Sequence, residues 1–124
     1  MGEICKRKSD LLSCGMAVLM SVALAACGNE PLTMIVGTYT DESASRGVYS
    51  YFFDQEKGTL VGGDEGRFTE APGAVGRVEM RNPSYITLSA DGRHIYAVSE
   101  VSDSTASAAT LRLGAKTGEM QLLV

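Results

Sequence analysis

Apolar and polar positions recur in the same order in two separate stretches of the chain. Each stretch has an apolar run, a polar loop, an alternating run, a charged turn with glycine and a second apolar run. The first stretch covers residues 35–60 and the second covers residues 95–120, and they align at an offset of 60 without a gap. Few residues are identical between the two stretches, so the evidence for a repeat lies in the shared pattern.

The alternating runs predict short strands, because strand side chains point to opposite faces with a period of two. Residues 47–54 give the clearest case: three aromatic side chains share one face, while Val48 and Phe52 take the other. Further strands are expected at residues 33–40, 59–61, 84–89, 94–100, 108–113 and 120–124. The apolar core of the strand at 94–100 is expected to be buried on both faces, between two neighbouring sheets.

Residues 62–81 are less regular and rich in glycine, which predicts a loop with one strand around residues 66–69. Arg67, Arg77 and Arg81 lie in or next to this loop. Three arginines could form an anion site, but the acidic residues among them favour a mobile loop that the charges keep soluble.

Self-similarity at this spacing in all-strand sequence predicts a repeat architecture, and four short antiparallel strands make up one β-propeller blade. The second stretch, with the strand before it, supplies all four strands, whereas the first lacks the innermost one. We therefore expect an all-β fold, a β-propeller of four-stranded antiparallel blades with about two blades present in residues 34–124. Two blades cannot close a ring, so the chain is expected to be an N-terminal fragment.

The start of the chain has the layout of a secretory signal. Residues 6–8 are basic, residues 11–26 carry no charge and are mostly apolar, and a Leu-Ala-Ala-Cys sequence ends at Cys27. This arrangement predicts a bacterial lipoprotein signal peptide at 1–26, lipidation of Cys27 and a tether over 27–33. The protein is then expected in the cell envelope, lipid-anchored on the periplasmic side or at the outer membrane. An uncleaved anchor helix is the alternative, although a spanning helix needs about 20 apolar residues.

Charge and cysteine content exclude several classes of function. The full chain has a formal net charge of −4, and loss of residues 1–26 removes three basic and two acidic residues, leaving 8 basic against 13 acidic. This balance argues against a nucleic-acid partner, because phosphate binding needs a basic face. Cys27 would be the only remaining cysteine, so no internal disulfide can form. No metal-ligand spacing, phosphate loop or dinucleotide fingerprint occurs, and neither a metal nor a cofactor is expected.

Several motifs resemble a known family when they are taken together. They are VGTYT at 36–40, GVY at 47–49, NPSY at 82–85, LSADGR at 88–93 and YAVSE at 96–100. Their order and spacing are similar to those of the first two blades of the seven-bladed propeller lactonases, over about residues 34–124. The chain departs from that pattern at Ser99, where the family often has Asn, and in the longer segment 62–81.

The resemblance implies a lactonase-like propeller, similar to 6-phosphogluconolactonase, which hydrolyses a sugar lactone ester, and the signal segment implies that this propeller is exported. The expected partner is a small-molecule lactone or a sugar acid. The principal catalytic groups would lie in later blades, so the fragment itself is expected to be inactive. A phosphorylated lactone made in the cytoplasm does not readily cross a membrane, which favours another lactone for an exported protein. A non-catalytic envelope propeller that binds glycans or proteins and a carboxymuconate cyclase-like isomerase remain alternatives.

Propeller ligands bind at one face, where the loops before the innermost strand and after the second strand meet. Glu100, the catalytic candidate, could act as a base or hold a substrate hydroxyl. Arg46 could bind an anionic substrate group, and Asn82 and Thr40 are further substrate-binding candidates. Three of them also have a plain structural interpretation: Glu100 as a strand-end carboxylate, Arg46 as a solvated arginine and Asn82 as a turn-forming residue. His94 is the only histidine and is expected at the opposite face, so no catalytic triad is indicated.

Overall fold

The computed structural model describes residues 29–124, which form strands and loops; the predicted signal segment and Cys27 lie outside these residues. The eight strands are β1 (Leu32–Gly37), β2 (Gly47–Asp54), β3 (Thr59–Val61), β4 (Gly76–Glu79), β5 (Pro83–Leu88), β6 (His94–Ser99), β7 (Ala108–Leu113) and β8 (Met120–Leu122). From residue 29 onward, the chain has no helix with the length and hydrophobicity needed to cross a membrane.

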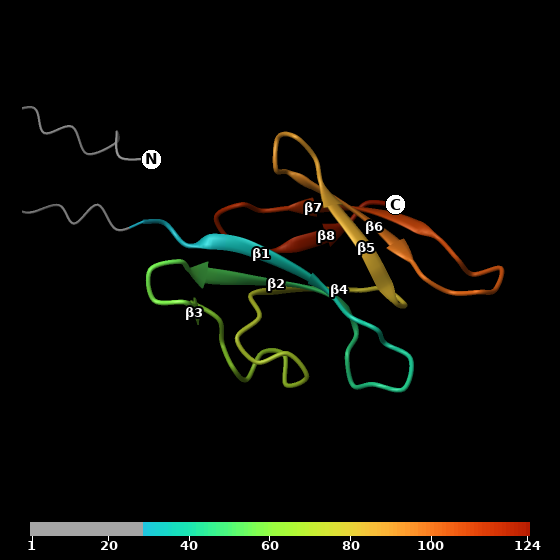
Figure 1. Ribbon diagram of the computed structural model, residues 1–124, viewed down its shortest axis with the longest axis horizontal. Coiled ribbons are helices and arrows are strands. Elements are labelled where there is room, and N and C mark those ends of the chain that lie inside the picture. The colour runs from blue at the N-terminus through green and yellow to red at the C-terminus, as the bar shows by residue number, and fades with distance from the viewer. Residues whose placement is uncertain (1–28) are drawn as a thin grey trace, which may run out of the picture.

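The strands form two four-stranded antiparallel sheets (Figure 1). The second sheet is an unbroken meander in the order β5-β6-β7-β8. In the first sheet, β2 is paired on one side with β1 and on the other with both β3 and β4. β3 pairs with the end of β2 at Asp54 and β4 with its start at Gly47, so together they form one interrupted outer strand. The prediction of an all-β fold with about two propeller blades is confirmed.

Strand positions agree with the sequence pattern except in the glycine-rich segment. β2 and β7 have the predicted bounds, and their alternating apolar positions account for this. The strand predicted around residues 66–69 is wrong: those residues lie in turns, and the outer strand is β4 at Gly76–Glu79. β4 forms because its backbone pairs with the first half of β2, a partner distant in sequence.

The second sheet repeats the strand pairing of the first, but β6 is shifted by one residue from the position that the 60-residue offset predicts. Phe53 lies opposite Leu60, and 60 residues later Leu113 lies opposite Met120, as the gap-free alignment predicts. Ile95, however, lies opposite Leu111, whereas the alignment would place it opposite residue 110. The cause is the loop between the two strands, which spans residues 38–46 in the first sheet and 100–107, one residue fewer, in the second.

The main core lies between the two sheets. Its buried side chains are Val48, Val78, Ile95, Leu111 and Leu113. Leu111 and Leu113 point inward, as predicted. The sheets approach closely at Gly76, where a Cβ atom would lie 2.4 Å from the carbonyl oxygen of Gly118. Any larger residue at this position would push the two sheets apart.

A second, smaller core lies on the other face of the first sheet. The segment that joins β3 to β4 (residues 62–75, here called the excursion) folds back over β2, where Ala71 and Ala74 bury Tyr49. Both faces of β2 are therefore covered. In β6 only one face is covered within residues 29–124, because Tyr96 and Val98 are each 45% exposed. The predicted burial of this strand on both faces is not seen, since only one neighbouring sheet is present there.

Candidate functional site

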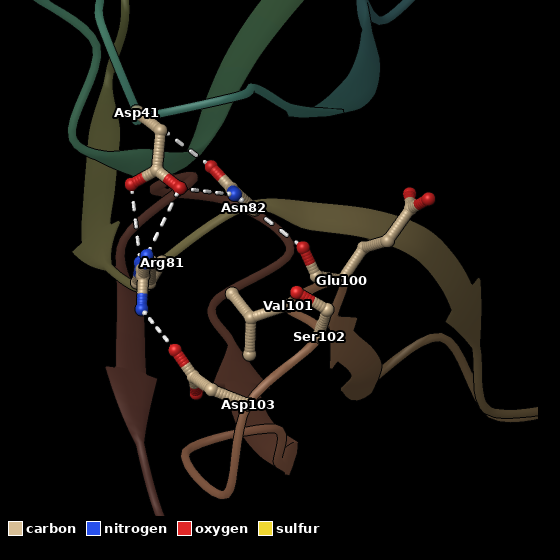
Figure 2. Close-up of a pocket in the computed structure, with 7 residues that line it drawn as sticks. All are labelled: Asp41, Arg81, Asn82, Glu100, Val101, Ser102 and Asp103. Atoms are coloured by element: carbon tan, nitrogen blue, oxygen red, sulfur yellow. Dashed lines mark hydrogen bonds and ion pairs between the residues drawn. The ribbon is translucent and has the colours of Figure 1, made fainter.

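Three loops meet at one end of the two sheets. They are residues 38–46 after β1, residues 80–82 before β5 and residues 100–107 after β6. A hollow of about 400 Å³ opens among them (Figure 2). Its lining residues are Asp41, Arg81, Asn82, Glu100, Val101, Ser102 and Asp103. The hollow therefore lies at the end of the sheets where the sequence analysis expects the ligand-binding face.

Asn82 is the centre of this hollow. It is 6% exposed and has a φ of 44°, a left-handed conformation that asparagine tolerates better than most residues. Its Oδ1 accepts hydrogen bonds from the backbone N–H groups of Thr40 (2.9 Å) and Asp41 (3.2 Å). Its Nδ2 donates to the Asp41 carboxylate (2.9 Å) and to the Glu100 carbonyl (3.4 Å). One buried side chain thus ties together loops from both sheets.

Arg81 is held between two carboxylates on the same hollow (Figure 2). Its Nε and Nη2 donate to the two oxygens of Asp41, each at 3.1 Å, and its Nη1 donates to Asp103 at 3.2 Å. Hydrogen bonds from Arg81 and then Asn82 hold the pKa of Asp41 below its usual value. Pairing with Asp41 and Asp103 raises the pKa of Arg81. The guanidinium therefore stays charged, but both of its sides already have partners.

Glu100 pairs with a tyrosine outside this cluster. The hydroxyl of Tyr39 donates to its carboxylate at 2.6 Å, and Figure 2 shows that carboxylate pointing away from Asp41 and Arg81. Hydrogen bonds from Tyr39 and then Ser84 lower the pKa of Glu100, and the pKa of Tyr39 is raised by the same contact. An ionised carboxylate of this kind accepts hydrogen bonds well, whereas an efficient general base needs a pKa nearer to neutral pH.

The structure brings three of the four candidate residues together and separates the fourth. Thr40, Asn82 and Glu100 are joined by hydrogen bonds, but Arg46 lines a different hollow on the other side of the 38–46 loop. The sequence analysis did not identify Tyr39 or Asp103 as site residues, and it considered Arg81 only as part of an anion site with Arg67 and Arg77. Their partners lie 61, 40 and 22 residues away in the chain, and no local motif marks such pairs.

The three arginines of the glycine-rich segment do not form one anion site. Arg67 pairs with Glu119 and Arg77 with Glu70, each at 2.7 Å, while Arg81 lines the hollow around Asn82. Each guanidinium is tied to a carboxylate of a different part of the fold. These pairs connect the excursion to its surroundings, contrary to the expectation that the charges only keep a mobile loop soluble.

The hollow suits a polar, uncharged ligand. Within residues 29–124, no group of three or more His, Cys, Asp or Glu side chains is placed to hold a metal ion. The hollow offers carboxylates, a hydroxyl and backbone groups, which together can bind the hydroxyl groups of a sugar. Surface ion pairs such as those of Arg81 contribute little to stability, so their main effect is to orient the loops.

Comparisons with known proteins agree with this geometry. No curated protein matches the chain closely. A candidate 6-phosphogluconolactonase of Bacteroides uniformis has a similar structure, with a TM-score of 0.64, 38% identity, 77% of this chain covered and 24% of that chain. A candidate 6-phosphogluconolactonase of Bacteroides fragilis has a TM-score of 0.65 and 31% identity, with 80% and 24% covered. The periplasmic gluconolactonase of Pseudomonas aeruginosa has a TM-score of 0.59 and 27% identity, with 77% and 24% covered.

The chain thus spans about a quarter of the length of these proteins. The sequence model described as lactonase, 7-bladed β-propeller, matches residues 33–124, which include every strand except the first residue of β1. With the two propeller blades and the ordered loops at one end, this match shows that the chain belongs to the seven-bladed β-propeller lactonase family.

Proposed function

We propose that this chain forms the first two blades of an exported lactone hydrolase that acts on an unphosphorylated sugar lactone. The observation that carries the proposal is the polar hollow around Asn82, built from loops of both sheets in a chain of the lactonase family. The principal catalytic groups would come from later blades, and residues 27–124 alone would be inactive.

The charges in the hollow favour an unphosphorylated substrate. Two carboxylates, those of Asp41 and Asp103, lie in the hollow on either side of its single arginine, and the carboxylate of a third lining residue, Glu100, points away from them. A phosphate group would meet these carboxylates without a free cation among the lining residues, which costs free energy. Among the structural neighbours, the periplasmic gluconolactonase agrees with this choice, whereas the two candidate 6-phosphogluconolactonases are named for the phosphorylated lactone, so the charges of the hollow carry the proposal.

Glu100 would bind a substrate hydroxyl and leave proton abstraction from water to another residue. Its carboxylate already accepts from Tyr39 and has a lowered pKa, so it is an acceptor at neutral pH. Thr40 would act through its backbone, which Asn82 holds in place. Polarisation of the lactone carbonyl and activation of water need further groups.

The test is turnover by the complete protein with glucono-1,5-lactone and with its 6-phosphorylated form. We expect kcat/KM to be at least tenfold higher for the unphosphorylated lactone, a difference of about 1.4 kcal/mol. The variant Glu100→Gln should raise KM, while Glu65→Gln, a change at an exposed carboxylate of the excursion, should leave it unchanged. A preference for the phosphorylated lactone would refute the substrate assignment, and inactivity on both lactones would refute the hydrolase. Product analysis by NMR would separate hydrolysis from isomerisation.

Export and lipid anchoring are part of the proposal and rest on the sequence of residues 1–27. Lipid on Cys27 would hold the protein to the membrane in the cell envelope. Cys27→Ser should move the protein from the membrane fraction to the soluble fraction. Unchanged fractionation of this variant would argue for an uncleaved anchor helix.

A second candidate function is sugar binding without catalysis. Tyr39 favours it, because this residue is 59% exposed and its hydroxyl contacts the Glu100 carboxylate. An exposed aromatic ring next to a hydrogen-bond acceptor offers an apolar face and a polar edge to a sugar. This candidate predicts that gluconate or glucose binds to the complete protein without turnover and that Tyr39→Ala weakens the binding.

A further inference from the structure

We propose that a second hollow, between the 38–46 loop and the excursion, binds a small oxyanion group through the guanidinium of Arg46. This hollow measures about 410 Å³ and is lined by Thr40, Ser43, Ala44, Ser45, Arg46, Thr69 and Glu70. It is separate from the Asn82 hollow. The proposal does not depend on lactone hydrolysis.

Arg46 has an exposed side chain that makes no hydrogen bond or ion pair with any residue from 29 to 124. This distinguishes it from Arg77 and Arg81, whose guanidinium groups both point to carboxylates. A guanidinium on a concave surface with free N–H donors matches a carboxylate or a phosphate group, which it can bind through two parallel hydrogen bonds.

The buried hydroxyl of Tyr49 links the two segments that form this hollow. The backbone N–H of Arg46 donates to the hydroxyl of Tyr49 at 2.8 Å, and that hydroxyl donates to Glu70 at 3.2 Å. Tyr49 itself is 1% exposed, so its position is fixed by the smaller core. The 38–46 loop and the excursion are therefore joined at one point beneath the hollow, which reduces the ordering that a ligand must impose.

Two of the acidic groups near the hollow already have cationic partners. Glu70, the only carboxylate among the lining residues, accepts from Arg77 at 2.7 Å. Two further carboxylates of the loop adjoin the lining residues: Asp41 faces Arg81 and Asn82, and Glu42 is exposed to solvent. Arg77 also pairs with Glu79 at 3.5 Å, so Arg46 is the only cationic lining residue, and its guanidinium rather than a net positive surrounding charge would attract the anion. The hydroxyls of Ser45 and Thr69 can add donors to a bound oxyanion.

The ligand group has two possible sources, the carboxylate of a sugar acid and a phosphate. Isothermal titration of the complete protein with D-gluconate and, separately, with inorganic phosphate distinguishes them. We expect at least one of the two to bind, and we expect Arg46→Gln to weaken that binding about tenfold, which corresponds to about 1.4 kcal/mol. Tyr49→Phe, which keeps the ring but removes the shared hydroxyl, should weaken it less, by about threefold.

Arg93→Gln is the matched control. Arg93 is also exposed and lies in the turn between β5 and β6, at the opposite end of the sheets, so its loss removes the same charge. It should leave binding unchanged. Equal weakening by Arg46→Gln and Arg93→Gln would show nonspecific attraction and overturn the proposal, as would the absence of binding by the unmodified protein at about millimolar ligand. Because binding is measured without turnover, a protein that hydrolyses no lactone can still confirm this site.

Discussion

The two sheets differ in how they complete the same four-stranded plan. The second sheet has four continuous strands, whereas the outer strand of the first is split into β3 and β4, with the excursion between them. Both pieces pair with the same edge of β2, so the ladder resumes after the interruption. The comparison teaches that the outer strand of a blade tolerates a long insertion, because the chain there can leave toward solvent and return.

The sheets also differ in how their faces are covered. In β2, Val48 is fully buried by the second sheet and Tyr49 is 1% exposed under the excursion. In β6, Ile95 is fully buried, but its neighbour Tyr96 is 45% exposed. The excursion therefore covers the outer face of β2 in the first sheet. The outer face of β6 in the second sheet is left open within residues 29–124.

The largest expected effect is in the core between the sheets. Leu111 is completely buried there, so Leu111→Ala should lower the free energy of unfolding by about 3 kcal/mol. The control is Leu60→Ala in β3, where the side chain is 45% exposed and the loss should be under about 1 kcal/mol. Chemical denaturation of the complete protein measures both. Equal losses would mean that the outer strand of the first sheet is packed as tightly as the centre of the second.

Substitution of Asn82 tests how the loops of the two sheets are connected around the hollow. Asn82→Gly accommodates the positive φ but removes the side chain, so the N–H groups of Thr40 and Asp41 lose their acceptor. Loss of these part-buried bonds should cost about 2 kcal/mol. Amide hydrogen exchange of residues 40 and 41 should speed up, and lactone turnover should fall. Unchanged exchange would mean that the 38–46 loop is ordered without Asn82.

The sequence predicted most of the fold because its strands have strong local patterns. The alternation in residues 47–54 and 108–113 identifies β2 and β7 without any tertiary information. β4 was placed wrongly because Gly76–Glu79 is short and forms a strand only by pairing with β2. The one-residue shift between the two repeats could not be predicted from the sequence either, since the loops that cause it contain no strong pattern.

The candidate site was predicted only in part, and for a physical reason. The family-like sequence drew attention to Asn82 and Glu100, but the number of hydrogen bonds that Asn82 makes depends on its buried position and left-handed backbone. Arg81 and Asp41 pair across 40 residues, and nothing in either local sequence indicates the partner. Pairings of this kind follow from the packing of the two sheets.

The excursion gives a prediction of intermediate size. Phe68 is partly buried against the smaller core, and its ring centroid lies 5.0 Å from the guanidinium carbons of both Arg67 and Arg77. Phe68→Ala should cost about 1.5 kcal/mol in unfolding free energy and should expose residues 62–75 to limited proteolysis. Phe68→Leu keeps the apolar contact and loses only the cation–π contribution, so it should cost under about 1 kcal/mol. Proteolysis of the alanine variant at the unmodified rate would show that the ion pairs alone hold the excursion.

The smallest expected effect concerns the pKa of Asp41 in the hollow around Asn82. The pKa of Asp41 is lowered in the folded protein, so its contribution to stability is fully present above its ordinary value of 3.8 and is lost as pH falls through the lowered pKa. Arg81→Gln removes the larger cause, and the pKa of Asp41 should move up toward 3.8. NMR titration of the Asp41 carboxyl carbon measures this shift, with Arg112→Gln, an exposed arginine of β7, as the control. An unchanged pKa in Arg81→Gln would mean that the Asn82 amide holds Asp41 ionised. The connection between the sheets would then depend on a buried hydrogen-bond network rather than on the exposed ion pair.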